Sequence, residues 1–183
     1  MSDARQALLD KVLAHAAEHG ISDLSLRQLA SDIGTSHRML IYHFGSREGL
    51  VAAIVAAVEA RQRAAMQELS SRVHTPSDLV RALWQQVADP QLRPFVRLFF
   101  EVLAHAFQRR PGTEGFLDQL TAPSLTEGRE AAANVGLDPP VSDVRLGVAL
   151  IRGLLIEVLA TGDDAGATES LERFIAMWEA DIT

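Results

Sequence analysis

The sequence contains no cysteine, which excludes disulfide bonds, thiolate metal sites and cysteine nucleophiles and is typical of a reducing cytoplasm. It has no run of eighteen apolar residues, so we expect no transmembrane helix and no membrane partner. Residues 1–5 precede no apolar stretch with a small-residue cleavage site, so we expect no secretory signal. Alternating β-branched runs are also missing. These absences predict a cytoplasmic protein without β-sheets.

Positive charge is scarce, because 17 basic residues face 24 acidic ones and the formal net charge is −7. A globally acidic chain is a poor candidate for binding nucleic acid. The excess acid lies mostly beyond residue 50, since residues 1–50 carry five basic and six acidic groups, a net charge of −1. Residues 25–50 hold three arginines and two histidines against two acidic groups. Any nucleic-acid surface is therefore expected between residues 25 and 50.

Helical periodicity runs through the whole chain. Its 183 residues are 48% hydrophobic, which is enough to bury a core and indicates one domain, or one domain with a small attached module. The fold class is therefore predicted to be all-α, with about nine helices and a helix break at Pro123. The predicted helices cover about residues 3–20, 25–34, 36–43, 46–71, 75–89, 92–108, 113–134, 141–161 and 167–182.

Two short helices near the N-terminus are predicted to form a helix-turn-helix. Ser25 and Gln28 form a capping box at the start of the first helix, and Gly34 provides the tight turn. An inner apolar stripe packs the pair, which leaves the second helix exposed. Its short polar, cationic and aromatic groups suit the DNA major groove. An alternative is a helical hairpin in an ordinary bundle. The outward residues are Ser36, His37, Arg38, Met39 and Tyr42.

Four stretches together resemble the DNA-binding domain of TetR-like transcriptional regulators. They are residues 18–21, 25–30, 33–36 and 42–50, within a match that is continuous over about residues 5–55. The resemblance implies a homodimeric repressor that a small, mostly apolar effector releases from a palindromic double-stranded DNA operator. It also implies a DNA-binding domain at residues 1–46 and an effector-binding and dimerisation domain at residues 47–183.

The resemblance assigns phosphate contacts to His43 and Arg47, and Arg27 is a third candidate. Arg38 is the best candidate base reader, because a bidentate guanidinium matches guanine. The sequence departs from the family at Ile41, which replaces a phosphate-contacting tyrosine. The predicted DNA-binding residues are Arg27, Thr35, Ser36, His37, Arg38, Met39, Tyr42, His43 and Arg47.

The middle helices carry most of the bulky aromatic side chains, with a few polar groups among them. An apolar cavity with few polar anchors is how small-molecule sites are built, although an aromatic stripe is also typical of plain core. His105 is the preferred polar group of this predicted pocket. The predicted effector residues are Trp84, Phe99, Phe100, Glu101, His105 and Arg152.

The last two helices carry apolar residues at helical spacing. The penultimate helix is apolar around much of its girth, so it needs cover on several sides, and pairing with a second chain would provide it. The predicted dimer-interface residues are Val148, Ile151, Leu155, Leu159, Leu171, Phe174, Ile175 and Trp178.

No catalytic or metal-binding motif accompanies these features. His15 and His19 lie four residues apart but lack a third ligand nearby, so no metal and no cofactor is predicted. Glu101 and His105 could form an acid–base pair, but a serine elbow, a phosphate loop and a dinucleotide fingerprint are all missing. We therefore expect that the protein is not an enzyme. One alternative is a helical small-molecule-binding or enzyme-like protein that does not bind DNA, and the acidic net charge favours it. A second alternative is a member of the TetR-like family that acts as an activator or has no effector.

Overall fold

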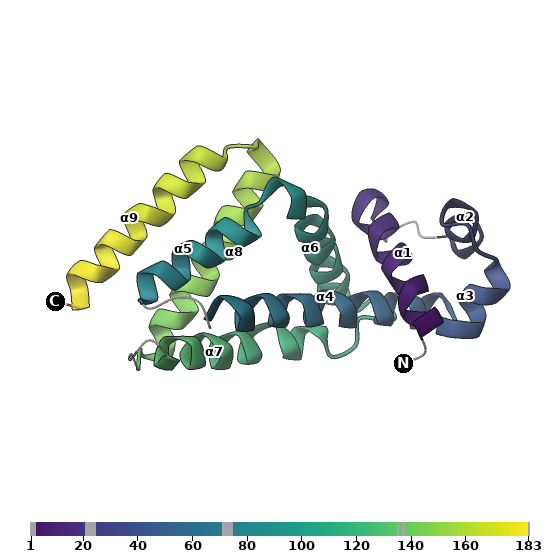
Figure 1. Cartoon of the computed structure of the whole chain (residues 1–183), viewed down its shortest axis with the longest axis horizontal. Helices are drawn as coiled ribbons and strands as arrows, with labels where there is room; N and C mark the ends of the chain where they lie inside the picture. Colours follow the sequence, from purple (N-terminus) through teal and green to yellow (C-terminus); the bar gives the residue numbers. More distant parts are fainter. Residues whose placement is uncertain (1–2, 21–24, 71–74, 135, 137, 183) are drawn as a thin grey trace. The chain divides into compact units, whose positions relative to one another are not determined.

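The computed structural model describes residues 3–20, 25–70, 75–134, 136 and 138–182, and all regular structure in these ranges is helical (Figure 1). The all-α prediction is confirmed for this part of the chain. No helix within it is long and apolar enough to cross a bilayer. The elements are α1 (Asp3–His19), α2 (Leu26–Asp32), α3 (His37–Phe44), α4 (Arg47–Ser70), α5 (Pro76–Val87), the 3₁₀ helix η1 (Pro90–Leu92), α6 (Arg93–Phe107), α7 (Phe116–Asn134), α8 (Val141–Thr161) and α9 (Asp164–Ile182).

Local side chains set several helix ends. The hydroxyl of Ser25 accepts from the backbone N–H of Gln28 at 3.5 Å, and that of Ser36 accepts from Met39 at 3.2 Å. Thr75 caps α5 in the same way, accepting from Asp78 at 3.1 Å. These bonds satisfy backbone donors that a helix start leaves unpaired, so capping residues predict the starts well.

Two predicted helix starts are wrong. The helix expected from residue 113 begins at Phe116, because residues 110–116 form successive turns and Gly115 has a positive φ of 78°. The helix expected from residue 167 begins at Asp164. The Asp163 carboxylate accepts from the N–H of Gly166 at 2.9 Å, which places Gly166 inside the first turn rather than in the connection.

The predicted break at Pro123 is also wrong, since α7 continues through it. Proline cannot donate a backbone N–H and crowds the preceding turn. Here side chains supply hydrogen bonds in the affected turn. The carbonyl of Leu120 accepts from the Ser124 hydroxyl at 2.9 Å and from Arg152 Nη2 at 2.8 Å. Arg152 lies on α8, so a tertiary contact supports the continuous helix.

The chain divides into two compact units. Unit 1 comprises residues 1–61 and 94–119, and unit 2 comprises residues 62–93 and 120–183. This division describes packing, whereas the predicted boundary at residue 46 concerns function and stays a prediction. The core of unit 1 joins α1–α4 with α6 and the start of α7. Its fully buried side chains include Val12, Leu29, Leu40, Leu50, Ile54, Leu98 and Phe116.

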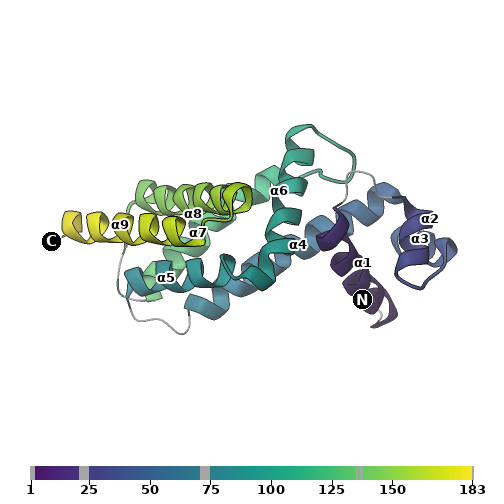
Figure 2. The same ribbon diagram turned by 90° about the horizontal axis from the view of Figure 1, so that it is seen from above.

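Unit 2 is organised around α9, which packs against α5 and α8 (Figure 2). Leu171 and Ile175 of α9 are completely buried. Trp84 Nε1 of α5 donates to the Thr168 hydroxyl of α9 at 2.9 Å. Arg81 Nε donates to both carboxylate oxygens of Glu172 at 3.0 Å, a pairing that raises the pKa of Arg81 above its usual value. Polar contacts therefore flank the apolar contact between α5 and α9.

Candidate nucleic-acid interface and effector region

The helices α2 and α3 meet at a tight turn around Gly34, which has a φ of 68°. The N–H of Thr35 donates to the carbonyl of Ala30 at 2.8 Å and closes this turn. Leu40 and Phe44 bury one face of α3. The predicted helix-turn-helix is confirmed. Its exposed side comprises Arg27, Ser36, His37, Arg38, Met39, Ile41 and Tyr42.

Tyr42 is the most exposed large hydrophobic side chain of α3, with 78% of its surface accessible. Its ring contacts the ring of the half-buried His43 edge-on, with centroids 4.9 Å apart. A phenol hydroxyl and an imidazole are thus presented together near the end of the helix. Ser36 differs from these, because its hydroxyl already accepts the N–H of Met39 as the helix cap. Thr35 is half-buried in the turn.

Arg5 is a residue of this region that the sequence analysis did not identify. Its Nε donates to the carbonyl of His43 at 3.3 Å, and its guanidinium lies 5.1 Å above the ring of Phe44. The contact spans 38 residues along the chain, so no local pattern predicts it. It ties the start of α1 to the end of α3 and brings a cation beside His43.

The start of α4 adjoins the end of α3. The Ser46 hydroxyl accepts the N–H of Gly49 at 3.1 Å, and a Cβ at Gly49 would collide with the carbonyl of Phe44. Arg47 is half-buried and Glu48 is exposed. Hydrogen bonds from its own backbone N–H and from the Ser46 hydroxyl, and the charge of Arg47, lower the pKa of Glu48. A carboxylate therefore occupies the positive end of α4, where a DNA phosphate is expected.

We expect Glu48→Gln to raise affinity for all DNA sequences by about two- to fivefold at low salt, since it removes an exposed charge that repels phosphate. Because the pKa of Glu48 is lowered, its carboxylate stays ionised even somewhat below the usual pKa of a glutamate, and the gain should persist over about pH 5–8. Fluorescence anisotropy with random-sequence duplexes measures it. Glu169→Gln, an exposed change on α9, is the matched control; an equal gain there would contradict a local effect.

Four predicted effector residues lie on α6 in unit 1. Phe99 contacts Phe100 and Phe116 at centroid distances of 5.3 and 6.0 Å; Phe116 is buried, whereas Phe99 and Phe100 are half-buried. A Cβ on Gly20 would lie 2.7 Å from the carboxylate of Glu101. Glu101 therefore packs against the end of α1. His105 is half-buried on the same helix.

The other two predicted effector residues lie in unit 2 and make structural contacts. Trp84 is buried and hydrogen-bonded to Thr168 at 2.9 Å. Arg152 binds the Leu120 carbonyl on α7, and burial lowers the pKa of its guanidinium, which nevertheless remains protonated. Sequence spacing cannot distinguish a polar group that supports a helix from one that meets a ligand.

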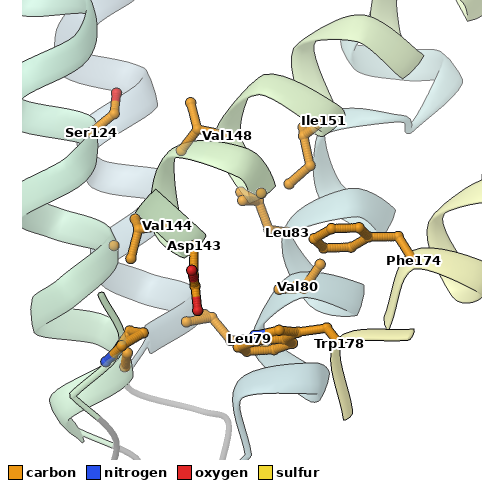
Figure 3. Close-up of a pocket in the computed structure, with 14 residues that line it drawn as sticks. Leu79, Val80, Leu83, Ser124, Asp143, Val144, Val148, Ile151, Phe174 and Trp178 are labelled. Atoms are coloured by element: carbon orange, nitrogen blue, oxygen red, sulfur yellow. The ribbon is translucent and has the colours of Figure 1, made fainter. Parts of the chain in front are cut away.

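A cavity of about 100 Å³ opens in unit 2 between α5, α7, α8 and α9 (Figure 3). None of the six predicted effector residues lines it, whereas four of the predicted dimer residues do: Val148, Ile151, Phe174 and Trp178. The residues that line it are Leu79, Val80, Leu83, Ser124, Gly128, Ala132, Pro139, Asp143, Val144, Gly147, Val148, Ile151, Phe174 and Trp178.

The structure separates the predicted dimer residues by burial. Leu171 and Ile175 are completely buried and Ile151 and Leu155 nearly so; Val148, Leu159, Phe174 and Trp178 are half-buried. Because Leu171 and Ile175 have no surface left to contact a second copy, the prediction is corrected for these two. A different face of α8 is an exposed apolar stripe at helical spacing, formed by Leu146, Ala149, Gly153, Ile156 and Ala160. Leu146 and Ile156 are 60% and 54% exposed.

His15 and His19 stack with ring centroids 4.3 Å apart, and His15 Nε2 lies 3.8 Å from a carboxylate oxygen of Asp32. Within the described residues, no three histidine or carboxylate side chains are grouped as a metal site requires. We therefore interpret His15 and Asp32 as a contact between α1 and α2, with His19 stacked on His15.

Residues 8–54 match the family model of bacterial regulatory proteins of the tetR family. No curated protein matches the chain in sequence. Similar solved structures include a Rhodococcus sp. protein assigned to the TetR family of transcriptional regulators, with 24% identity, 98% of each chain covered and a TM-score of 0.73. A TetR transcriptional regulator from Legionella pneumophila is 17% identical, with 97% of each chain covered and a TM-score of 0.71. The multidrug binding protein EbrR, complexed with imidazole, is 25% identical over 94% of this chain and 90% of its own, with a TM-score of 0.62.

Proposed function

We propose that the chain is a TetR-like transcriptional regulator that acts as a homodimeric repressor, because residues 8–54 match the tetR family model and contain the helix-turn-helix. A small, mostly apolar molecule releases it from a palindromic operator. The exposed face of α3 carries this proposal, since it presents His37, Arg38 and Tyr42 on a helix that is buried only through Leu40 and Phe44. Because the proposed target is an operator on a bacterial chromosome, the protein is proposed to act in the cytoplasm.

On DNA, the N-terminal half of α3 enters the major groove, where Arg38 reads a base and His37, Met39 and Thr35 contact neighbouring edges. His43, Arg47 and Arg27 bind phosphates around it, and Tyr42 supplies the hydroxyl that Ile41 lacks. The net charge of −7 does not oppose this arrangement, because residues 1–50 carry only −1 of it.

Dimerisation is proposed through the apolar stripe of α8. Three of its residues, Ala149, Gly153 and Ala160, have small side chains that permit close approach of a second helix, while Leu146 and Ile156 supply apolar area. An isologous pair of such stripes buries both copies at once.

Within unit 1, the last step of the coupling between effector and DNA is proposed to run through α6. This helix shares unit 1 with α1–α4, and its Glu101 packs against Gly20 at the end of α1. In the loop after α6, a Cβ on Gly112 would lie 2.5 Å from the carbonyl of Glu48. A shift of α6 would therefore displace the end of α1 and the start of α4.

A gel shift with DNA from upstream of the protein's own gene tests the function. We expect a retarded band at a two-fold symmetric sequence and its loss on addition of a metabolite extract. Random duplex of equal length is the control. A band that forms equally on both duplexes, or that every extract fraction leaves unchanged, would contradict specific, effector-responsive repression.

We expect His43→Ala and Arg47→Ala each to weaken binding to all DNA sequences and to reduce the slope of log affinity against log salt by about one unit. The physical reason is that each cation releases about one counterion from the phosphates it neutralises. Titrations at several salt concentrations measure the slope. Arg173→Ala, an exposed change on α9 with the same loss of charge as Arg47→Ala, should leave it unaltered. An unchanged slope in both α3–α4 variants would argue against phosphate contacts.

A further inference from the structure

The cavity of unit 2 is walled by apolar side chains from four helices (Figure 3). The helices α7 and α8 close one side by direct approach, since a Cβ on Gly128 would lie 2.6 Å from Val144 Cγ1. Ser124 and Asp143 are its two polar side chains. The lining is almost entirely apolar. Ser124 already donates to the Leu120 carbonyl at 2.9 Å, and Asp143 is the one charged residue among those that line the cavity.

Asp143 is half-buried, and the Ser142 hydroxyl donates to its Oδ1 at 3.1 Å. In the described part of the chain, no arginine or lysine forms an ion pair with it. Figure 3 shows the carboxylate on the side of the cavity where Leu79 and Trp178 lie. A carboxylate beside apolar walls is stabilised by a partner of opposite charge, and the face of a tryptophan ring attracts cations.

We propose that this cavity binds a small organic cation, consisting of one apolar group and one ammonium group. The apolar group fills the space between Leu83, Val148 and Ile151. The ammonium donates to the carboxylate of Asp143 and contacts the ring of Trp178. The inference rests on the proposed effector response and names the chemical class of the effector.

The size of the cavity limits the ligand. A cavity of about 150 Å³ lined by apolar residues holds one benzene ring. The present cavity measures about 100 Å³ and is partly open. Its enclosed part is therefore smaller than a site for one benzene ring, so a ring or a short branched alkyl group fits only if part of the ligand, with the ammonium, extends through the open side.

Calorimetric titration of the full chain without DNA tests the site with three matched probes: benzylammonium, benzyl alcohol and benzoate. We expect benzylammonium to bind about tenfold more tightly than benzyl alcohol, because a hydrogen bond between two charged groups is stronger than a neutral one. Benzoate should bind more weakly than both. No heat from benzylammonium at up to about 10 mM, or equal affinity for all three probes, would overturn the proposal.

Asp143→Asn should remove the preference for benzylammonium and leave the affinity for benzyl alcohol unchanged. A merely structural role for Asp143 at the start of α8 would lower both affinities together. Glu169→Gln removes the same charge from the exposed side of α9 and should keep the preference for benzylammonium.

Gly147→Leu tests whether the probes bind in this cavity. It should lower the affinity for both benzylammonium and benzyl alcohol, because Gly147 lines the cavity and a Cβ there meets no atom within 4 Å. Retention of the preference in Asp143→Asn would assign the cation to another place, and unaltered binding in Gly147→Leu would exclude this cavity.

A second measurement separates this site from the proposed function. If benzylammonium binds in an Asp143-dependent manner but leaves the protein–operator complex intact, the cation site is confirmed and its proposed role in releasing the operator is contradicted. If benzylammonium releases the operator equally from native protein and from Asp143→Asn, effector-responsive repression is supported and the proposed cation site at Asp143 is contradicted. A changed dimer dissociation constant in Asp143→Asn without a change in probe binding would show that a second copy occupies the cavity.

Discussion

Replacement of Ile156 by glutamate is expected to convert the protein to a monomer and to abolish tight operator binding. Ile156 is 54% exposed near the middle of the apolar stripe on α8. In an isologous interface each copy contributes one such carboxylate, so two charges are buried without partners. At about 3–5 kcal/mol for each uncompensated charge, the dimer dissociation constant should rise by roughly four orders of magnitude or more.

Light scattering at micromolar concentration and operator titration measure the two effects. Phe107→Glu is the matched control, because Phe107 is 66% exposed at the end of α6 and lies outside the stripe. It should remain dimeric. A charge at the nearly buried Leu155 would instead disrupt the fold, so it cannot test the interface. A monodisperse monomer of the native chain, or an Ile156→Glu protein that remains dimeric, would contradict this interface.

Arg38→Ala is expected to relax the base preference at one position of each half-site. Arg38 is exposed in the first turn of α3, beside His37, where a helix-turn-helix meets base edges. A bidentate contact to guanine provides about 1–3 kcal/mol of discrimination, so two half-sites lose roughly 2–6 kcal/mol of operator affinity. Affinity for non-specific DNA should fall much less.

Selection of binding sites from random duplexes measures this preference. The affected position should occur twice, in half-sites about 34–36 Å apart or somewhat more. Arg38→Lys is the sharper variant, because it keeps the charge but loses the bidentate donor pair, and it should relax the same position. If native protein and Arg38→Ala select identical sequences, Arg38 contacts phosphate or solvent and His37 or Tyr42 becomes the candidate reader.

Features that depend on neighbours along the chain could be predicted from the sequence. Ser25 and Ser36 start their helices because the hydroxyl of each accepts a backbone N–H three residues ahead. The turn at Gly34 requires a positive φ, which glycine adopts without strain. The helix-turn-helix follows from these short-range features, and its exposed residues follow from the period of the helix.

Features that depend on distant partners could not be predicted in this way. Arg152 supports α7 at Pro123, Glu101 packs on Gly20 and Trp84 binds Thr168, although all three resemble pocket residues by spacing. Arg5 contacts the end of the helix-turn-helix only because α1 passes the end of α3.

The sequence by itself thus determined the all-α class, most helix ends and the recognition helix, because each depends on hydrogen bonds and periodicity within a few residues. Only the tertiary structure decided which apolar faces of α8 and α9 are buried, that α7 continues through Pro123, and that Asp143 borders an apolar cavity. The physical reason is that burial is a property of pairs of elements: one helical stripe can face a core, a ligand or a second chain, and only packing selects among them.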